Sequence, residues 1–200
     1  MPEEQSNSEA ALLAAADRAM ERYADGDDAA FEQVFAAIGQ RIRKFLRRLC
    51  GSDELALDLL QETLLRLHQS RGAFRPGSPV LPWAYTIARN VFLDAARSRK
   101  RAPARVDLDD AQQQSAVSVP AEAESTLLAR QTAALVERAL GEMTPARREA
   151  FVLLRFEGLS VAVAAEVLGV SENAVKLRAF QAYEIIREKL SRLEQARPLR

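Results

Sequence analysis

Residues 159–190 have the pattern of two short helices joined by a tight turn. Ser160 and Ser171 stand where an N-cap side chain accepts a hydrogen bond from a free backbone N–H group at a helix start. Gly169 lies between them, and glycine readily adopts the left-handed conformation that such a turn requires. Ala164 is small enough to let the two helices cross closely. We therefore predict a helix-turn-helix whose second helix enters the major groove of DNA, although similar helix pairs occur in proteins that bind no DNA.

The rest of the chain shows the hydrophobic periodicity of helices. Apolar residues recur at spacings of three and four over residues 31–49, 53–69 and 82–101. Asp27 or Asp28 is expected to cap the first of these helices, Gly51 to end it, and Ser52 to begin the second. The sequence has no alternating strand pattern and no glycine-rich phosphate loop. We therefore predict an all-α fold.

A change in composition divides the chain into two helical parts. Residues 102–125 contain Pro103, Pro120 and three consecutive glutamines, with acidic side chains and few large apolar ones. Such a segment cannot bury enough apolar surface to fold alone, so we predict a flexible acidic linker. The expected organisation is an N-terminal extension (1–22), a helical domain (23–101), the linker (102–125), a second domain with the helix-turn-helix (126–192) and a C-terminal tail (193–200).

The charged residues are balanced in number but separated along the chain. There are 28 Lys and Arg residues and 28 Asp and Glu residues, which gives a net charge of zero. Acidic residues dominate the first 28 positions, whereas basic residues cluster over 41–48, over 97–105 and from Lys176 onward. Such blocks create local fields that a zero sum hides, so balanced composition does not exclude a nucleic-acid partner.

Cysteine and histidine usage argues against several kinds of site. Cys50 is the only cysteine and His68 the only histidine. An intrachain disulfide is impossible, and a zinc site of the usual type is disfavoured. We expect no catalytic residues, no metal, no other cofactor and no small-molecule substrate. The acidic start is unlike a signal peptide and no apolar run approaches the ~20 residues of a membrane span, which predicts a cytoplasmic protein.

Several short motifs occur in an order that resembles one protein family. They are DGD at 25–27, DLLQET at 58–63, PWAY at 82–85 with IARN at 87–90, and LGVS at 168–171 with VK at 175–176. Over about residues 23–190 the chain resembles a bacterial sigma factor of the extracytoplasmic-function (ECF) group. It departs from the family pattern in two places: VAVA stands at 161–164 where an acidic pair and isoleucine are usual, and FQ stands at 180–181 where many members have an arginine.

The resemblance implies a polymerase-binding helix over residues 53–69. Its expected core-polymerase contacts are Asp58, Leu59, Gln61, Glu62 and Arg66. Residues spaced by four lie along one stripe of a helix, which groups the polar members of this set. Without the resemblance, the same stripe is also explained as a solvated charge ladder. The implied partner is core RNA polymerase, through its largest and second-largest subunits.

The resemblance also implies two DNA-binding surfaces. The expected −10 contacts, beside the loop over 71–82, are Trp83, Tyr85, Arg89, Asn90, Arg97, Arg99, Lys100 and Arg101. An asparagine amide offers the donor and acceptor that suit adenine, and arginines hold phosphates without reading sequence. A core role for Trp83 is the alternative, since we expect Trp83, Ile87, Val91 and Ala95 to share the apolar face of their helix.

The recognition helix supplies the second DNA-binding surface. The expected −35 contacts are Ser171, Glu172, Asn173, Lys176, Leu177, Arg178, Phe180 and Gln181. Most of them lie on the outer side if Val175, Ala179 and Ala182 face inward. Phe180 then either touches a thymine methyl group or packs in the core.

The predicted function is transcription initiation. A sigma factor binds core polymerase, recognises the −35 and −10 elements of promoter DNA and melts the −10 region. The resemblance also implies an anti-sigma factor as a partner, either soluble or membrane-bound. The alternative is a dimeric helix-turn-helix regulator that acts on a two-fold symmetric operator without polymerase.

Overall fold

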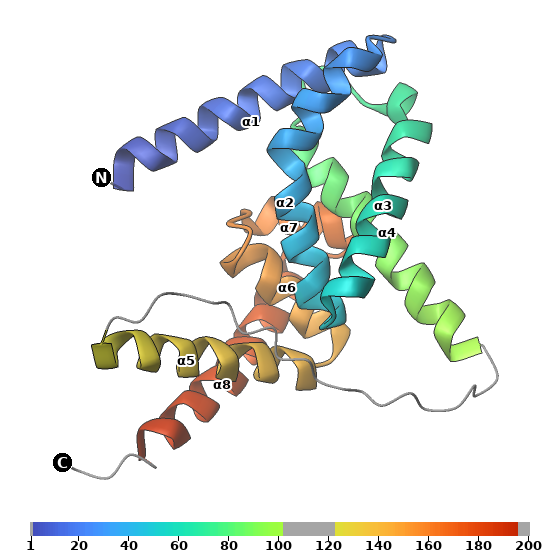
Figure 1. Cartoon of the computed structure of the whole chain (residues 1–200). Coiled ribbons are helices and arrows are strands. Elements are labelled where there is room, and N and C mark those ends of the chain that lie inside the picture. Colours follow the sequence, from blue (N-terminus) through green and yellow to red (C-terminus); the bar gives the residue numbers. More distant parts are fainter. Residues whose placement is uncertain (1, 102–122, 196–200) are drawn as a thin grey trace. The chain divides into compact units, whose positions relative to one another are not determined.

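The computed structural model describes residues 2–101 and 123–195 (Figure 1). Over these residues the chain forms eight α-helices and two short 3₁₀ helices, and no strand. It divides into two compact units, with the division at residue 110. The predicted all-α, two-domain architecture is confirmed. Most of the predicted linker, residues 102–122, lies outside the described residues.

The first unit is a bundle around one central helix. Its helices are α1 (Pro2–Ala24), α2 (Phe31–Cys50), α3 (Asp53–Gln69) and α4 (Val80–Arg101), with η1 (Asp28–Ala30) and η2 (Arg71–Ala73) in the connections. Helix α2 packs against α1, α3 and α4. Most of the predicted apolar stripe of α2 lies in the core, and its buried members include Val34, Ile38, Ile42, Phe45, Leu46 and Leu49, whereas Phe35 is 44% exposed.

Helix α1 contributes to this core. Ala16, Ala19, Met20 and Tyr23 are all at most 3% exposed, and they recur at the spacing of one helix face. The folded unit therefore begins before residue 23, the expected domain start. Two of the four buried residues are alanines, so the apolar signal of this face is weak in the sequence.

Local start and stop signals are observed at most of the predicted positions. Ser52 Oγ accepts a hydrogen bond from Leu55 N at 3.2 Å and caps α3. Gly51 ends α2 in the left-handed conformation at φ 74°. The prediction that Asp27 or Asp28 caps α2 was wrong, because η1 precedes α2 and places Ala30 at its N-cap.

The second unit contains the predicted helix-turn-helix. Its helices are α5 (Ala123–Glu142), α6 (Pro145–Arg155), α7 (Val161–Leu168) and α8 (Glu172–Gln195). Helix α8 packs against the other three, and α5 crosses it in Figure 1. The buried side chains that join these helices include Leu140, Val152, Leu153, Ala164, Val175 and Ala182.

The turn between α7 and α8 has the geometry that its sequence predicts. Ser160 Oγ accepts from Val163 N at 3.3 Å, and Ser171 Oγ accepts from Ala174 N at 3.3 Å. Gly169 ends α7 with φ 64°. The turn is therefore fixed by two side-chain caps and one left-handed glycine.

We predict opposite effects for alanine at two glycines of this unit. Gly169→Ala lowers the free energy of unfolding by about 1–2 kcal/mol, because a side chain disfavours the left-handed conformation. Gly141→Ala, within α5, raises it by about 0.5 kcal/mol, because alanine has the higher helix propensity. An added Cβ meets no atom within 4 Å at either site, so crowding does not contribute. Urea unfolding followed by circular dichroism measures both, and equal effects at the two sites would contradict the assignment of the turn.

Candidate nucleic-acid and polymerase-binding surfaces

The polar stripe of α3 lies at the surface, with one expected member turned inward. Asp58 and Gln61 are exposed, and Glu62 and Arg66 are half-buried. Leu59 is only 5% exposed and packs in the core. Leu59 therefore helps to hold the helix in place, and the polar side chains are the ones that a partner can reach.

Arg66 links this stripe to the neighbouring helix. Its Nε donates to Glu62 Oε1 on the same helix, and its Nη1 donates to Asp94 Oδ2 on α4, both at 2.8 Å. Asp94 also accepts from Arg97 at 3.1 Å. The hydrogen bonds to Asp94 and then Glu62 raise the pKa of Arg66, and the hydrogen bond from Arg66 is the largest cause of the lowered pKa of Asp94.

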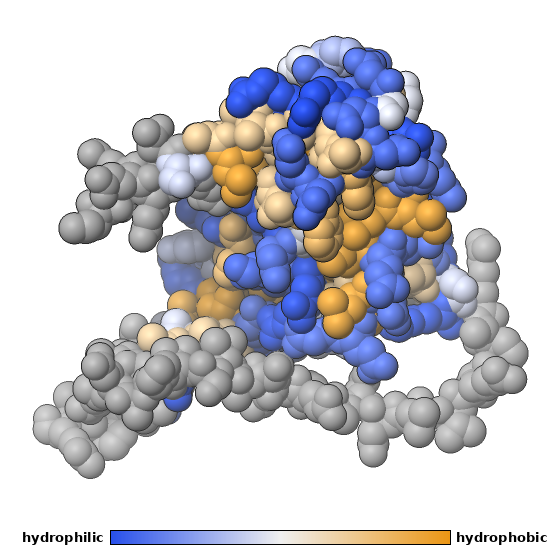
Figure 2. Space-filling model, turned by 45° about the horizontal axis from the view of Figure 1, so that its top comes forward, coloured by the Kyte–Doolittle hydropathy of each residue, from blue (hydrophilic) through white to orange (hydrophobic). Residues whose placement is uncertain are grey.

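Two exposed leucines adjoin the same stripe. Leu57 and Leu65 are 42% and 50% exposed, and Gln61 lies midway between them at helical spacing. Apolar residues also reach the surface among charged ones on the face drawn in Figure 2. These leucines were not among the predicted contacts, although their spacing of eight residues places them on one side of the predicted helix.

Helix α4 presents a different face to the core than the sequence suggested. Tyr85 is fully buried, and its ring meets the edge of Phe45 at a centroid distance of 5.0 Å. Ala84, Ala88 and Val91 are buried with it. We therefore remove Tyr85 from the expected −10 contacts, because its side chain is enclosed by the bundle.

The outer face of α4 carries several of the remaining −10 candidates. Trp83 is half-buried and rests on Phe74 from the preceding loop, with ring centroids 5.2 Å apart. Asn90 and Arg97 are exposed and follow Trp83 at intervals of seven residues, or two helical turns. The structure thus aligns an aromatic ring, an amide and a guanidinium on one helix face.

The other basic candidates on α4 lie nearby along the helix. Arg89 is half-buried, whereas Arg99 is exposed. The side chains of Lys100 and Arg101 lie outside the described residues.

The outer face of α8 agrees with the predicted recognition surface. Val175 and Ala182 are fully buried, as expected. The exposed residues on the opposite side are Glu172, Asn173, Lys176, Leu177 and Phe180. Phe180 is 62% exposed, which excludes the alternative that it packs in the core of this unit.

Two other −35 candidates contribute to the fold of the unit. Gln181 Oε1 accepts a hydrogen bond from Arg147 Nε of α6 at 2.9 Å, and Ser171 caps α8. Arg178 is half-buried. Tyr183 is 46% exposed and lies three residues after Phe180, so it continues the same face. Tyr183 was not among the predicted contacts, although its helical spacing from Phe180 places it on this face.

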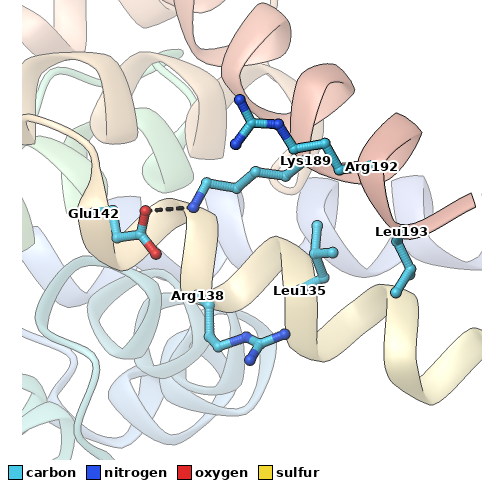
Figure 3. A pocket seen from close by; sticks show the side chains of 6 residues that line it. All are labelled: Leu135, Arg138, Glu142, Lys189, Arg192 and Leu193. Atoms are coloured by element: carbon cyan, nitrogen blue, oxygen red, sulfur yellow. Dashed lines mark hydrogen bonds and ion pairs between the residues drawn. The ribbon is translucent and has the colours of Figure 1, made fainter. Parts of the chain in front are cut away.

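Two shallow pockets lie on the surface of the second unit. One lies at the helix-turn-helix and is lined by residues of α7, the turn and the start of α8. The other lies between α5 and α8, where Leu135 and Leu193 sit beside the ion pair of Lys189 with Glu142 (Figure 3). This ion pair joins the two helices, so the second pocket is part of their packing.

The described residues offer no metal centre and little thiol chemistry. They contain no group of three or more His, Cys, Asp or Glu side chains that could hold a metal ion. Burial raises the pKa of Cys50, whose thiol donates to Ser52 O at 3.2 Å. A raised pKa makes the thiolate scarcer at neutral pH. None of the helices in the described ranges is long and apolar enough to cross a membrane.

We predict that Asp94 titrates below the ordinary aspartate pKa of about 3.9 because Arg66 favours its charged form. Its ion pair therefore stabilises the fold above that ordinary value, and the contribution is lost as pH falls through the lowered pKa. Arg66→Met raises the pKa of Asp94, as measured by NMR of the carboxyl carbon. Arg97→Met is the matched control and has the smaller effect. A larger effect at Arg97 would contradict the assignment.

Family models match both units. The Sigma-70 region 2 model matches residues 34–102, and the Sigma-70 region 4 model matches residues 133–186. The first match spans most of α2, α3 and α4, and the second contains the helix-turn-helix.

Individual proteins match over most of the chain. The RNA polymerase sigma factor CarQ of Myxococcus xanthus is 38% identical over 88% of this chain and 97% of its own length. The ECF RNA polymerase sigma factor SigM of Mycobacterium tuberculosis is 34% identical over 95% of this chain and 85% of its own. The solved structure of CnrH with the cytosolic domain of CnrY covers 92% of this chain and 99% of that chain, at 26% identity and a TM-score of 0.64. The chain therefore belongs to the extracytoplasmic-function group of RNA polymerase sigma factors.

Proposed function

We propose that this protein binds core RNA polymerase and directs it to promoters by reading the −35 element as duplex and the −10 element as single strand. The observation that carries the proposal is the presence, in two separately folded units, of an outward face suited to each form of DNA. These are the α8 face in the second unit and the α4 face in the first.

The proposed polymerase contact is the exposed stripe of α3. Asp58, Gln61 and Glu62 supply the polar part, and Leu57 with Leu65 adds apolar area beside it. An apolar patch with a polar surround is the usual anatomy of a protein interface. Arg66 pairs with Glu62 on α3 and with Asp94 on α4, and these ion pairs orient its guanidinium group at the end of the stripe.

The proposed −10 contact uses the outer face of α4. An unpaired base needs an apolar wall to stack on and a polar group that reads its edge. Trp83 supplies a half-exposed ring, and Asn90 supplies a donor and an acceptor two turns further along. The exposed guanidinium groups of Arg97 and Arg99 can neutralise the phosphate backbone.

The proposed −35 contact uses the first turns of α8. Glu172 can accept a hydrogen bond from cytosine, and Lys176 can donate to guanine or phosphate. Phe180 offers an exposed apolar ring for a thymine methyl group. Residues 102–122, between α4 and α5, can span up to ~70 Å when extended. Two elements ~17 base pairs apart are separated by roughly 55–60 Å, so the linker is long enough for both contacts.

An anti-sigma factor is the proposed regulatory partner. The structure of RpoE from Bartonella quintana, which shares the fold at 24% identity, contains the anti-sigma factor NepR. The CnrH structure contains the cytosolic domain of CnrY. We propose that a comparable protein covers the polymerase- and DNA-binding faces of this chain.

Reconstitution with purified core polymerase tests the proposed function. We expect a stable complex on gel filtration and promoter-dependent run-off transcripts from a template library randomised at both elements. Sequencing of the transcribed templates identifies the promoter. Protection of a two-fold symmetric duplex site without polymerase, together with the absence of transcripts, would instead favour the dimeric regulator.

We predict that Phe180→Ala weakens binding to the −35 element because it removes a contact between the Phe180 ring and one thymine methyl group. In the wild-type holoenzyme, replacing that thymine with deoxyuracil lowers promoter affinity by about fivefold to tenfold, corresponding to about 1–1.4 kcal/mol. The same replacement has little effect on the Phe180→Ala holoenzyme, because the contact is already lost. Arg187→Ala, two turns further along α8, is the control and retains sensitivity to the methyl group. Filter binding at fixed salt measures all three, and equal methyl sensitivity in Phe180→Ala would contradict the contact.

A further inference from the structure

Two carboxylates of α1 hold the segment that precedes the proposed −10 helix. Glu21 Oε1 accepts a hydrogen bond from Gly77 N at 2.6 Å. Asp17 Oδ1 accepts from Val80 N at 2.7 Å, and this second bond is partly buried. The two acidic residues are four positions apart, so they lie along one edge of α1. That edge adjoins the face of α1 that packs into the core.

The bond from Asp17 also fixes the start of α4. Val80 is the first residue of this helix, and the first N–H groups of a helix have no partner within it. A carboxylate at this position satisfies one such group and interacts favourably with the helix dipole. Trp83 follows within the first turn, so its ring is placed by the same anchor.

The first residues of the loop between α3 and α4 also contact the region around α1. The Arg71 guanidinium lies 5.3 Å from the centroid of the Tyr23 ring, and it pairs with Asp28 at 3.6 Å. Between these anchors, Phe74 is 6% exposed and packs under Trp83. Residues 75–77 remain exposed at the surface.

We infer that Asp17 and Glu21 are positioning residues for capture of the unpaired −10 base. They do not contact DNA in this arrangement. They hold residues 74–80 and the start of α4 in the conformation that binds the unpaired base. Ordering a loop before binding lowers the conformational entropy lost when a ligand binds. This inference rests on the proposed function of the α4 face.

Double variants distinguish loss of the hydrogen-bond acceptor from loss of the negative charge. The double variant Asp17→Ala with Glu21→Ala (the alanine pair) removes both acceptors. The double variant Asp17→Asn with Glu21→Gln (the asparagine–glutamine pair) removes the charge but retains a carbonyl oxygen at each site. The control pair, Asp25→Ala and Glu32→Ala, removes the same charge from exposed neighbouring positions. Each variant is combined with core polymerase and a promoter carrying 2-aminopurine in its −10 element, whose fluorescence reports opening.

We expect the alanine pair to slow promoter opening by about tenfold, while its affinity for core polymerase stays within about twofold of wild type. The asparagine–glutamine pair and the control pair should open the promoter within about twofold of the wild-type rate. Wild-type opening by the alanine pair would overturn the inference. An equal loss of polymerase affinity and opening rate would also overturn it, because that result indicates general destabilisation.

Hydrogen exchange of the wild-type chain provides a second test that requires no variant. The amides of Gly77 and Val80 should exchange at least about tenfold more slowly than in an unstructured peptide. Exchange of Gly77 at the unprotected rate would contradict the anchor even if the alanine pair failed to fold. A wild-type protein that binds no polymerase would contradict the proposed function, and the exchange result would still decide whether the anchor exists.

Discussion

Burial of one apolar stripe on α2 determines most of the first unit. Residues such as Ile38, Phe45 and Leu49 are at most 1% exposed and meet three surrounding helices. Each large apolar side chain that is fully buried contributes about 1.5–3 kcal/mol, whereas an exposed ion pair contributes about 0–1 kcal/mol. Apolar packing therefore decides which faces of α3 and α4 are covered. The ion pairs of Arg66 act on an arrangement that is already set.

The same packing places the proposed polymerase and −10 surfaces on adjacent helices of one body. Arg66 of α3 and Asp94 of α4 are bonded at 2.8 Å. The buried edge-to-face contact between Tyr85 and Phe45 packs α4 against α2. In the second unit, the caps and the left-handed Gly169 set how α8 leaves the turn. Its buried face then leaves Leu177 and Phe180 at the surface.

Much of the local structure was predictable because it depends on residues close in sequence. Helical periodicity located the helices, and Asp53–Gln69 was predicted with the bounds that the structure has. The ability of a serine side chain to cap a helix identified three helix starts, at Ser52, Ser160 and Ser171. The side of α8 that carries Phe180 also followed from spacing, since burial of Val175 leaves the opposite face outside.

The sequence alone determined the helical class, the two-part organisation and the turn of the helix-turn-helix, because these follow from local backbone preferences and hydrophobic period. Only the tertiary structure decided which residues on a helix are enclosed. Period places Trp83 and Tyr85 on different faces of α4, but the shape of the neighbouring core decides that Tyr85 is the buried one. The bond between Asp17 and Val80 spans 63 positions of the chain, and no local signal indicates such a partner. Side-chain contacts between distant segments form only when packed helices bring them together.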